Sequence, residues 1–164
     1  MIEQAFLQFS ADKLAELSGR IEDCLGRLTA DQIWVRNADN ENSVGNIVLH
    51  LCGNVRQWIL SGVGGQPDHR DRDSEFAARG GFQPAELAAK LKAASGEAAE
   101  VIRSVPVARL MEKKTIQKVY DTTMMEAIYH VVEHFAGHTG QIIFATKLLT
   151  GHDLGYYKHL SKSV

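Results

Sequence analysis

Residues Thr123 to Gly151 read TMMEAIYHVVEHFAGHTGQIIFATKLLTG, the clearest helical pattern in the chain. Thr123 and Glu126 have the spacing of a capping box, in which each side chain accepts a hydrogen bond from the other residue's backbone N–H. Gly151 is typical of a residue that ends a helix. The apolar residues between them recur at helical spacing, at Ala127, Val131, Phe135, Ile142 and Leu149. The stretch therefore predicts a long amphipathic helix.

Three more long helices are expected from the same periodicity, over Ile2–Leu28, from Ser43 to about Leu60, and from Pro84 to about Val105. A short turn is expected around Ile33 and Trp34. Four long helices and no convincing strand predict an all-α fold, a four-helix bundle that forms a single domain over residues 1–164.

The connections between these helices are expected to be irregular. Residues Arg36–Asn42 are rich in Asn and Asp, which favour turns. Residues His69–Arg79 alternate in charge and predict a surface loop with a short helical piece, whereas Met111–Val119 predicts a long extended connection.

Composition excludes two classes of partner. The net charge of −2 and the pI of about 6.4 leave no basic excess for a phosphate backbone, so we expect no nucleic acid. The longest apolar runs fall short of the roughly 20 residues that span a bilayer, so we expect no membrane and a cytoplasmic protein.

Cys24 and Cys52 form no CxxC pair and are expected to be reduced and partly buried.

Three histidines lie four residues apart on the last predicted helix: His130, His134 and His138. Neighbours at this spacing present their imidazoles on one side of a helix, a common way to bind a metal. On a helical wheel His138 lies within the apolar face, His134 lies beside it, and His130 lies further outward. The inner pair, His134 and His138, is therefore the predicted ligand pair, and His130 is better placed as a supporting or entrance residue.

Two histidines do not normally complete a metal site, so a third ligand is expected from another helix. His50 is the only histidine of the second predicted helix and flanks its apolar stripe. From spacing alone, a hydrogen-bonded core histidine is the commoner alternative for this residue. His69, His152 and His159 lie in loop or tail sequence and are expected at the surface.

Two other metal chemistries do not fit the spacing. A carboxylate-bridged di-iron bundle needs Glu-x-x-His, and no Glu in this chain has His three residues later. The HExxH pattern of metalloproteases is absent as well.

The combined pattern resembles the DinB/YfiT-like superfamily of four-helix-bundle metalloenzymes. That family carries one ligand histidine on its second helix and an HxxxH pair on its last, typically followed by Gly-Gln. The matching residues here are His50, His134 and His138, with Gly140 and Gln141 after them. The segment RDRDSEFAARGGF, residues 70–82, also resembles the same region of an uncharacterised DinB-like subgroup.

The resemblance implies one divalent transition metal per chain, zinc or nickel, and a homodimer. Some relatives are similar to S-transferases or isomerases that use a low-molecular-weight thiol such as bacillithiol or mycothiol, so we expect a small-molecule substrate and thiol-dependent S-transfer. A metal-dependent hydrolase and a non-catalytic, metal-stabilised stress-response binding protein stay open as alternatives. No catalytic residue is assigned. The candidates are His130, Gln141, Tyr129 and the arginines Arg70, Arg72 and Arg79, for which a solvated loop is the favoured interpretation.

Overall fold

The structure, a computed structural model, describes residues 1–160 and is mostly helical, with one small sheet. Its long helices are α1 (Ile2–Leu25), α2 (Val44–Val55), α4 (Pro84–Ser104) and α5 (Met124–Thr150). The shorter helical segments are η1 (Gln32–Trp34), η2 (Arg56–Val63), α3 (Arg72–Ala77), η3 (Val107–Arg109) and η4 (Lys158–Leu160). The strands are β1 (Lys113–Ile116) and β2 (Tyr120–Thr123).

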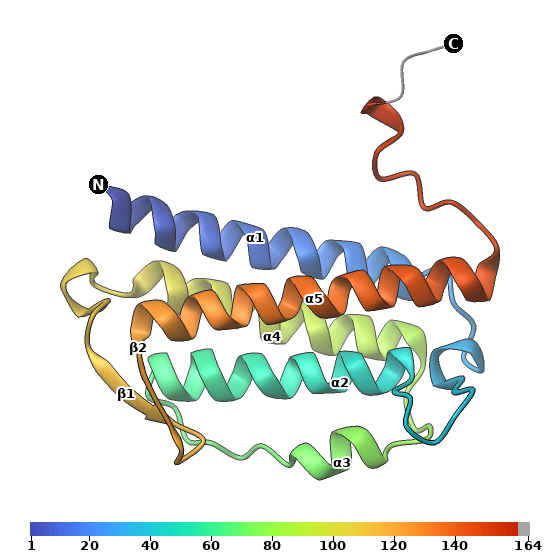
Figure 1. Cartoon of the computed structure of the whole chain (residues 1–164), viewed down its shortest axis with the longest axis horizontal. Coiled ribbons are helices and arrows are strands. Elements are labelled where there is room, and N and C mark those ends of the chain that lie inside the picture. The colour runs from blue at the N-terminus through green and yellow to red at the C-terminus, as the bar shows by residue number, and fades with distance from the viewer. Residues whose placement is uncertain (161–164) are drawn as a thin grey trace.

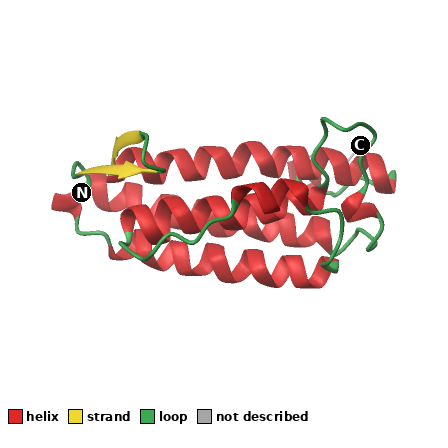
Figure 2. Ribbon diagram, turned by 90° about the horizontal axis from the view of Figure 1, so that it is seen from below, coloured by secondary structure: helices red, strands yellow, loops and turns green. Residues whose placement is uncertain are grey.

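The long helices lie side by side along the length of the molecule (Figure 1). Helix α1 packs on α4 and α5, and α2 packs on the same two helices, so that one apolar core runs between all four. The short helix α3 and the chain before it lie against α2. Figure 2 shows the two strands at the end of the molecule that holds the N terminus, away from the C-terminal end. The elements that carry the candidate ligands, α2 and α5, are therefore neighbours.

The ends of the long helices agree closely with the sequence pattern. The Thr123–Glu126 capping box is present, and Gly151 ends α5 with a positive φ of 69°. Ser43 caps α2 by accepting a hydrogen bond from the backbone N–H of Asn46. Helix α1 is shorter than predicted, because Gly26 and a turn follow Leu25.

The second predicted helix is α-helical only as far as Val55. Residues Arg56–Val63 continue it as the π-helical segment η2, which the sequence did not predict. Its bulky apolar residues are buried: Trp58, Ile59, Leu60 and Val63. Gly62 allows the close approach of the hairpin, because a Cβ there would lie 2.6 Å from the Ile116 side chain. The π-helical turn thus carries Trp58 to the place where α5 and the hairpin meet.

The prediction of a fold without strands was wrong, because the extended connection expected over Met111–Val119 contains a strand, Lys113–Ile116, that pairs with the strand after it. Strands β1 and β2 pair antiparallel, with Lys113 opposite Thr123 and Ile116 opposite Tyr120. The turn between them places Gln117 and Lys118 at φ of 55° and 61°. Tight hairpin turns of this kind normally use Asn or Gly, which tolerate positive φ. Gln and Lys carry no such signal, which is why the sequence pattern missed the hairpin.

Within the described residues no helix is long and apolar enough to cross a membrane. Cys24 and Cys52 are both free and buried. Burial raises the pKa of the Cys52 thiol to about 12, so this cysteine is a poor candidate for a thiolate nucleophile.

Candidate metal centre

Helix α5 places His134 and His138 on the side that faces α2. The residues that anchor this helix in the core, Val131 and Phe135, are fully buried. The two histidines lie one turn apart beside that apolar face and are half-buried. Their ring centroids are 4.5 Å apart, and the rings meet edge to face.

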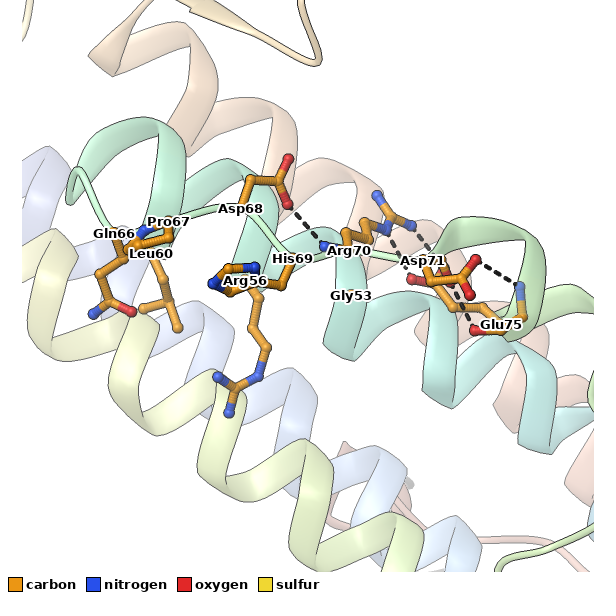
Figure 3. A pocket seen from close by; sticks show the side chains of 11 residues that line it. Gly53, Arg56, Leu60, Gln66, Pro67, Asp68, His69, Arg70, Asp71 and Glu75 are labelled. Atoms are coloured by element: carbon orange, nitrogen blue, oxygen red, sulfur yellow. Dashed lines mark hydrogen bonds and ion pairs between the residues drawn. The ribbon is translucent and has the colours of Figure 1, made fainter.

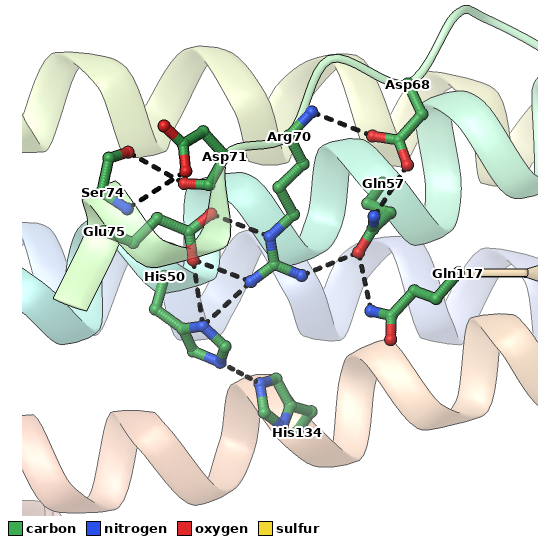
Figure 4. Close-up of polar contacts among 9 residues, drawn as sticks. All are labelled: His50, Gln57, Asp68, Arg70, Asp71, Ser74, Glu75, Gln117 and His134. Carbon is green, nitrogen blue, oxygen red and sulfur yellow. Dashed lines mark hydrogen bonds and ion pairs between the residues drawn. The ribbon is translucent and has the colours of Figure 1, made fainter. Parts of the chain in front are cut away.

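Helix α2 brings His50 against this pair from the opposite side. His50 is 6% exposed, and its ring centroid lies 5.0 Å from that of His134 and 5.1 Å from that of His138. The Nε2 atoms of His50 and His134 are 2.9 Å apart (Figure 4). One ring nitrogen from each of the three histidines lies within 4.8 Å of the others. The structure thus brings together the three residues that the spacing and the resemblance selected.

Burial keeps the imidazoles of His134 and His138 neutral. It is the largest influence on His134, and together with the neighbouring histidines it lowers the pKa of that ring to about 4. Burial also lowers the pKa of His138 below the ordinary histidine value, against the opposing effect of Gln141. A neutral imidazole offers a lone pair to a cation, so these two rings are ready to bind a metal near neutral pH.

An ion pair that the sequence did not predict lies directly behind His50. Arg70 donates from Nε and Nη2 to the two carboxylate oxygens of Glu75, at 2.8 Å each (Figure 4). The two side chains are only 3% and 9% exposed. Burial raises the pKa of the Glu75 carboxyl, but the hydrogen bonds from Arg70 and His50 outweigh it and hold the pKa below its ordinary value. The expectation of a solvated Arg70 was therefore wrong.

Nη1 of Arg70 joins the ion pair to the hairpin. Arg70 Nη1 donates to Gln57 Oε1 at 2.9 Å, and Gln117 Nε2 donates to the same oxygen at 2.6 Å. Gln57 in turn donates to Asp68 at 2.7 Å. These contacts tie η2, the loop before α3 and the β1–β2 turn to the charge pair behind His50.

The other sequence candidates lie around the edge of the cluster. Gln141 Oε1 is 2.8 Å from Nδ1 of His138. His130 stays outside the group of three and stacks on Trp58 and His134, with centroid distances of 4.2 and 5.5 Å. Tyr129 is 65% exposed. His130 therefore lies where the helical wheel placed it, next to the cluster rather than in it.

The other two arginines of the Arg70–Arg79 segment have separate partners. Arg72 lies over the ring of Phe76, 4.8 Å from its centroid, and Phe76 in turn packs against His50 at 4.9 Å. Arg79 donates to backbone carbonyls at the end of α3. His69, His152 and His159 are exposed, as expected from their places in the sequence.

The Arg70–Glu75 pair also lines a pocket of about 410 Å³ (Figure 3). It is lined by α2, η2 and the loop that follows, including Gly53, Arg56 and His69. None of the three clustered histidines lines this pocket. The pocket is separate from the face on which the three ring nitrogens converge.

Comparison with known proteins gives a family but no activity. The sequence profile of a family described as "Protein of unknown function (DUF1572)" matches residues 1–161. A solved structure described as "Crystal structure of the conserved protein of locus from Enterococcus faecalis" superposes with a TM-score of 0.71, at 17% sequence identity, covering 88% of this chain and 97% of that one. No curated protein matches. The likeness to the solved structure supports the fold alone, and the chain belongs to the DUF1572 family.

Proposed function

We propose that this protein is a divalent-metal-binding member of the DinB/YfiT-like superfamily, with a four-helix bundle in which His50, His134 and His138 hold one ion. The single observation that carries the proposal is the convergence of one nitrogen from each histidine within 4.8 Å. The arrangement of the long helices and the similarity to the conserved Enterococcus faecalis protein support the fold assignment.

The donor set fits a zinc-type centre. All three donors are imidazoles, which suit zinc and nickel, and within residues 1–160 no thiol or carboxylate joins the group. Three protein ligands with a fourth position open are the usual composition of a catalytic site, whereas structural zinc sites are closed by four. A divalent ion held in this way supplies an electrophilic centre that lowers the pKa of a bound thiol or water.

The reaction that we propose is transfer of a low-molecular-weight thiol to a small electrophilic substrate. The chain contributes neutral imidazoles, kept so by burial, and an aromatic wall at Phe76 beside His50. Neither buried cysteine lies in the cluster, so the reacting thiol would come from a second molecule.

The metal proposal is tested by elemental analysis of untagged protein. We expect about one zinc or nickel ion per chain after loading and removal of excess metal. Protein that stays metal-free after this treatment would contradict the proposed function.

The reaction is tested with zinc-loaded protein and a panel of thiols and electrophiles, with His138→Ala as the matched inactive control. Thiol-dependent consumption of the electrophile by the wild type alone supports S-transfer. Ester hydrolysis without any thiol, lost in the same variant, would replace S-transfer by the hydrolase alternative.

We also propose a homodimer. Helix α5 leaves several large apolar side chains exposed, Tyr129, Phe144 and Leu148, at 64–69% exposure. Exposed apolar residues on one helix are a common feature of subunit interfaces. Light scattering should give twice the chain mass of 18.1 kDa, and a monomer mass at all concentrations would contradict the dimer.

A further inference from the structure

Two polar groups compete for Nδ1 of His50. Glu75 Oε2 lies 3.2 Å from this nitrogen, and Arg70 Nη2 lies 3.0 Å from it. A neutral imidazole carries one N–H proton, so the hydrogen bond that Nδ1 makes decides which of the two ring nitrogens keeps a free lone pair. If Nδ1–H donates to Glu75, Nε2 is free to bind a metal. If Nδ1 accepts from Arg70, Nε2 carries the proton and cannot bind.

The anionic carboxylate of Glu75 favours the first arrangement. Arg70 already donates to both oxygens of Glu75 and, through Nη1, to Gln57. The carboxylate of Glu75, by contrast, is an acceptor with lone pairs to spare, and a hydrogen bond to an anionic oxygen is among the strongest that imidazole can make. Nη2 of Arg70 keeps one hydrogen for Nδ1, but only the bond from Nδ1–H to the Glu75 carboxylate leaves Nε2 with the lone pair that a metal needs.

We propose that Glu75 is the positioning residue of the metal centre: its carboxylate accepts the Nδ1–H of His50 and so presents Nε2 of that ring to the divalent ion. The inference rests on the proposed metal centre and extends it to the α3 segment. Buried Arg70 holds Glu75 in place, so the segment that carries both residues is part of the site.

Gly53 gives this proposal a second, independent observation. A Cβ at residue 53 would lie 1.8 Å from Glu75 Oε1 and 2.9 Å from Arg70 Nε. Any larger residue at position 53 would push the ion pair away from His50. Glycine in the middle of a helix weakens it, and here the space it leaves holds Glu75.

The charges also indicate which ligand the open position would take. Glu75 is neutralised by Arg70, and an imidazole that binds a metal does so as an uncharged ligand, so the shell around the ion adds no net negative charge. A divalent ion in such a shell keeps its full charge and favours an anionic fourth ligand, such as a thiolate or hydroxide.

The experiment measures zinc affinity by chelator competition for the wild type, Glu75→Gln, Gly53→Ala and a control, Gly96→Ala. Loss of a supporting partner of a ligand histidine typically weakens metal binding about 10–100-fold. We expect that loss for Glu75→Gln and also for Gly53→Ala, which removes no polar group. Gly96→Ala should bind as the wild type does, because nothing lies within 4 Å of its added Cβ.

A second readout is the ¹⁵N NMR spectrum of His50 in metal-free protein, which reports the tautomer directly. We expect the proton on Nδ1 in the wild type and a shift of population toward Nε2–H in Glu75→Gln. A merely structural role for Glu75 would lower thermal stability without changing this signature. The wild-type tautomer stands as a test even if a variant fails to fold.

The outcomes separate the two proposals. Zinc binding by the wild type that is unchanged in both variants, or a wild-type His50 with its proton on Nε2, overturns the role of Glu75. A wild type that binds no zinc overturns the proposed function, while the tautomer of His50 still decides whether Glu75 orients the ring.

Discussion

The two sides of the histidine cluster are supported in different ways. On the α2 side, His50 lies against a buried ion pair between Arg70, in the loop before α3, and Glu75 on α3, which are 20 and 25 positions further along the chain. On the α5 side, His138 contacts Gln141, an exposed residue one turn along the same helix. One side depends on tertiary contacts and the other on helical spacing. The difference indicates where substitutions will affect the site most.

The first prediction compares His138 with His130, both one turn from His134. His138→Ala should lose zinc almost completely, because it removes one of the three converging nitrogens. His130→Ala should keep most of the affinity, since its ring stacks beside the cluster. Calorimetric titration of zinc into both variants measures this difference.

Melting temperatures provide the companion measurement. A ligand at 100 times its Kd stabilises the folded state by about 2.7 kcal/mol, so zinc should raise the melting temperature of His130→Ala and leave that of His138→Ala unchanged. The reverse pattern would show that the ligand pair on α5 is His130 and His134.

The second prediction concerns pH. The pKa of His134 is about 4 in the folded protein, against 6.5 for an unperturbed histidine. Between these values the unfolded chain binds a proton at residue 134 that the folded chain does not, so stability present above pH 6.5 is lost as the pH falls toward 4. The melting temperature of metal-free protein should fall over this interval. A His134→Gln variant should show a flatter profile, and equal slopes would contradict the assignment.

The third prediction compares Gln141, which contacts His138, with Glu75, which contacts His50. Gln141→Leu should weaken zinc binding less than Glu75→Gln does, by under about tenfold, because water can replace an exposed amide as the partner of His138. The matched control is Gln8→Leu on α1, whose amide donates to Asp12 far from the cluster. A larger loss for Gln141→Leu than for Glu75→Gln would reverse the comparison between the two sides.

The ends of the long helices and the α5 side of the histidine cluster could be predicted from local sequence. The helix ends at Ser43, Thr123 and Gly151 follow from side-chain caps and from the conformational freedom of glycine, which act over a few residues. His134 and His138 could be selected from their spacing and the wheel. These features could be predicted because each depends only on residues within about one helical turn of one another.

The parts that were missed depend on contacts distant in sequence. Arg70 and Glu75 belong to a stretch that reads as a solvated loop, and only the packing of α3 on α2 buries them. The one available signal was Gly53, a glycine inside a predicted helix with no turn to explain it. The hairpin was missed because Gln117 and Lys118 adopt positive φ without the usual turn residues.

The smallest predicted effect compares two helical glycines. Nothing lies within 4 Å of a Cβ built at Gly19 on α1, whereas the space at Gly53 is filled by Glu75. Gly19→Ala should therefore raise the free energy of unfolding by about 0.5–1 kcal/mol through helix propensity alone, without changing zinc affinity. Denaturant titration measures the change, and a destabilised Gly19→Ala would show that this face of α1 is occupied in solution.

The most direct test of the metal centre is the X-ray absorption spectrum of zinc-loaded protein. We expect three imidazole nitrogens at about 2.0–2.1 Å and one further light ligand from solvent. His50→Ala should lose one of the three imidazole contributions. A spectrum with sulfur from the protein, or with four protein nitrogens, or one unchanged in His50→Ala, would contradict the assignment of His50, His134 and His138 as an open three-histidine site.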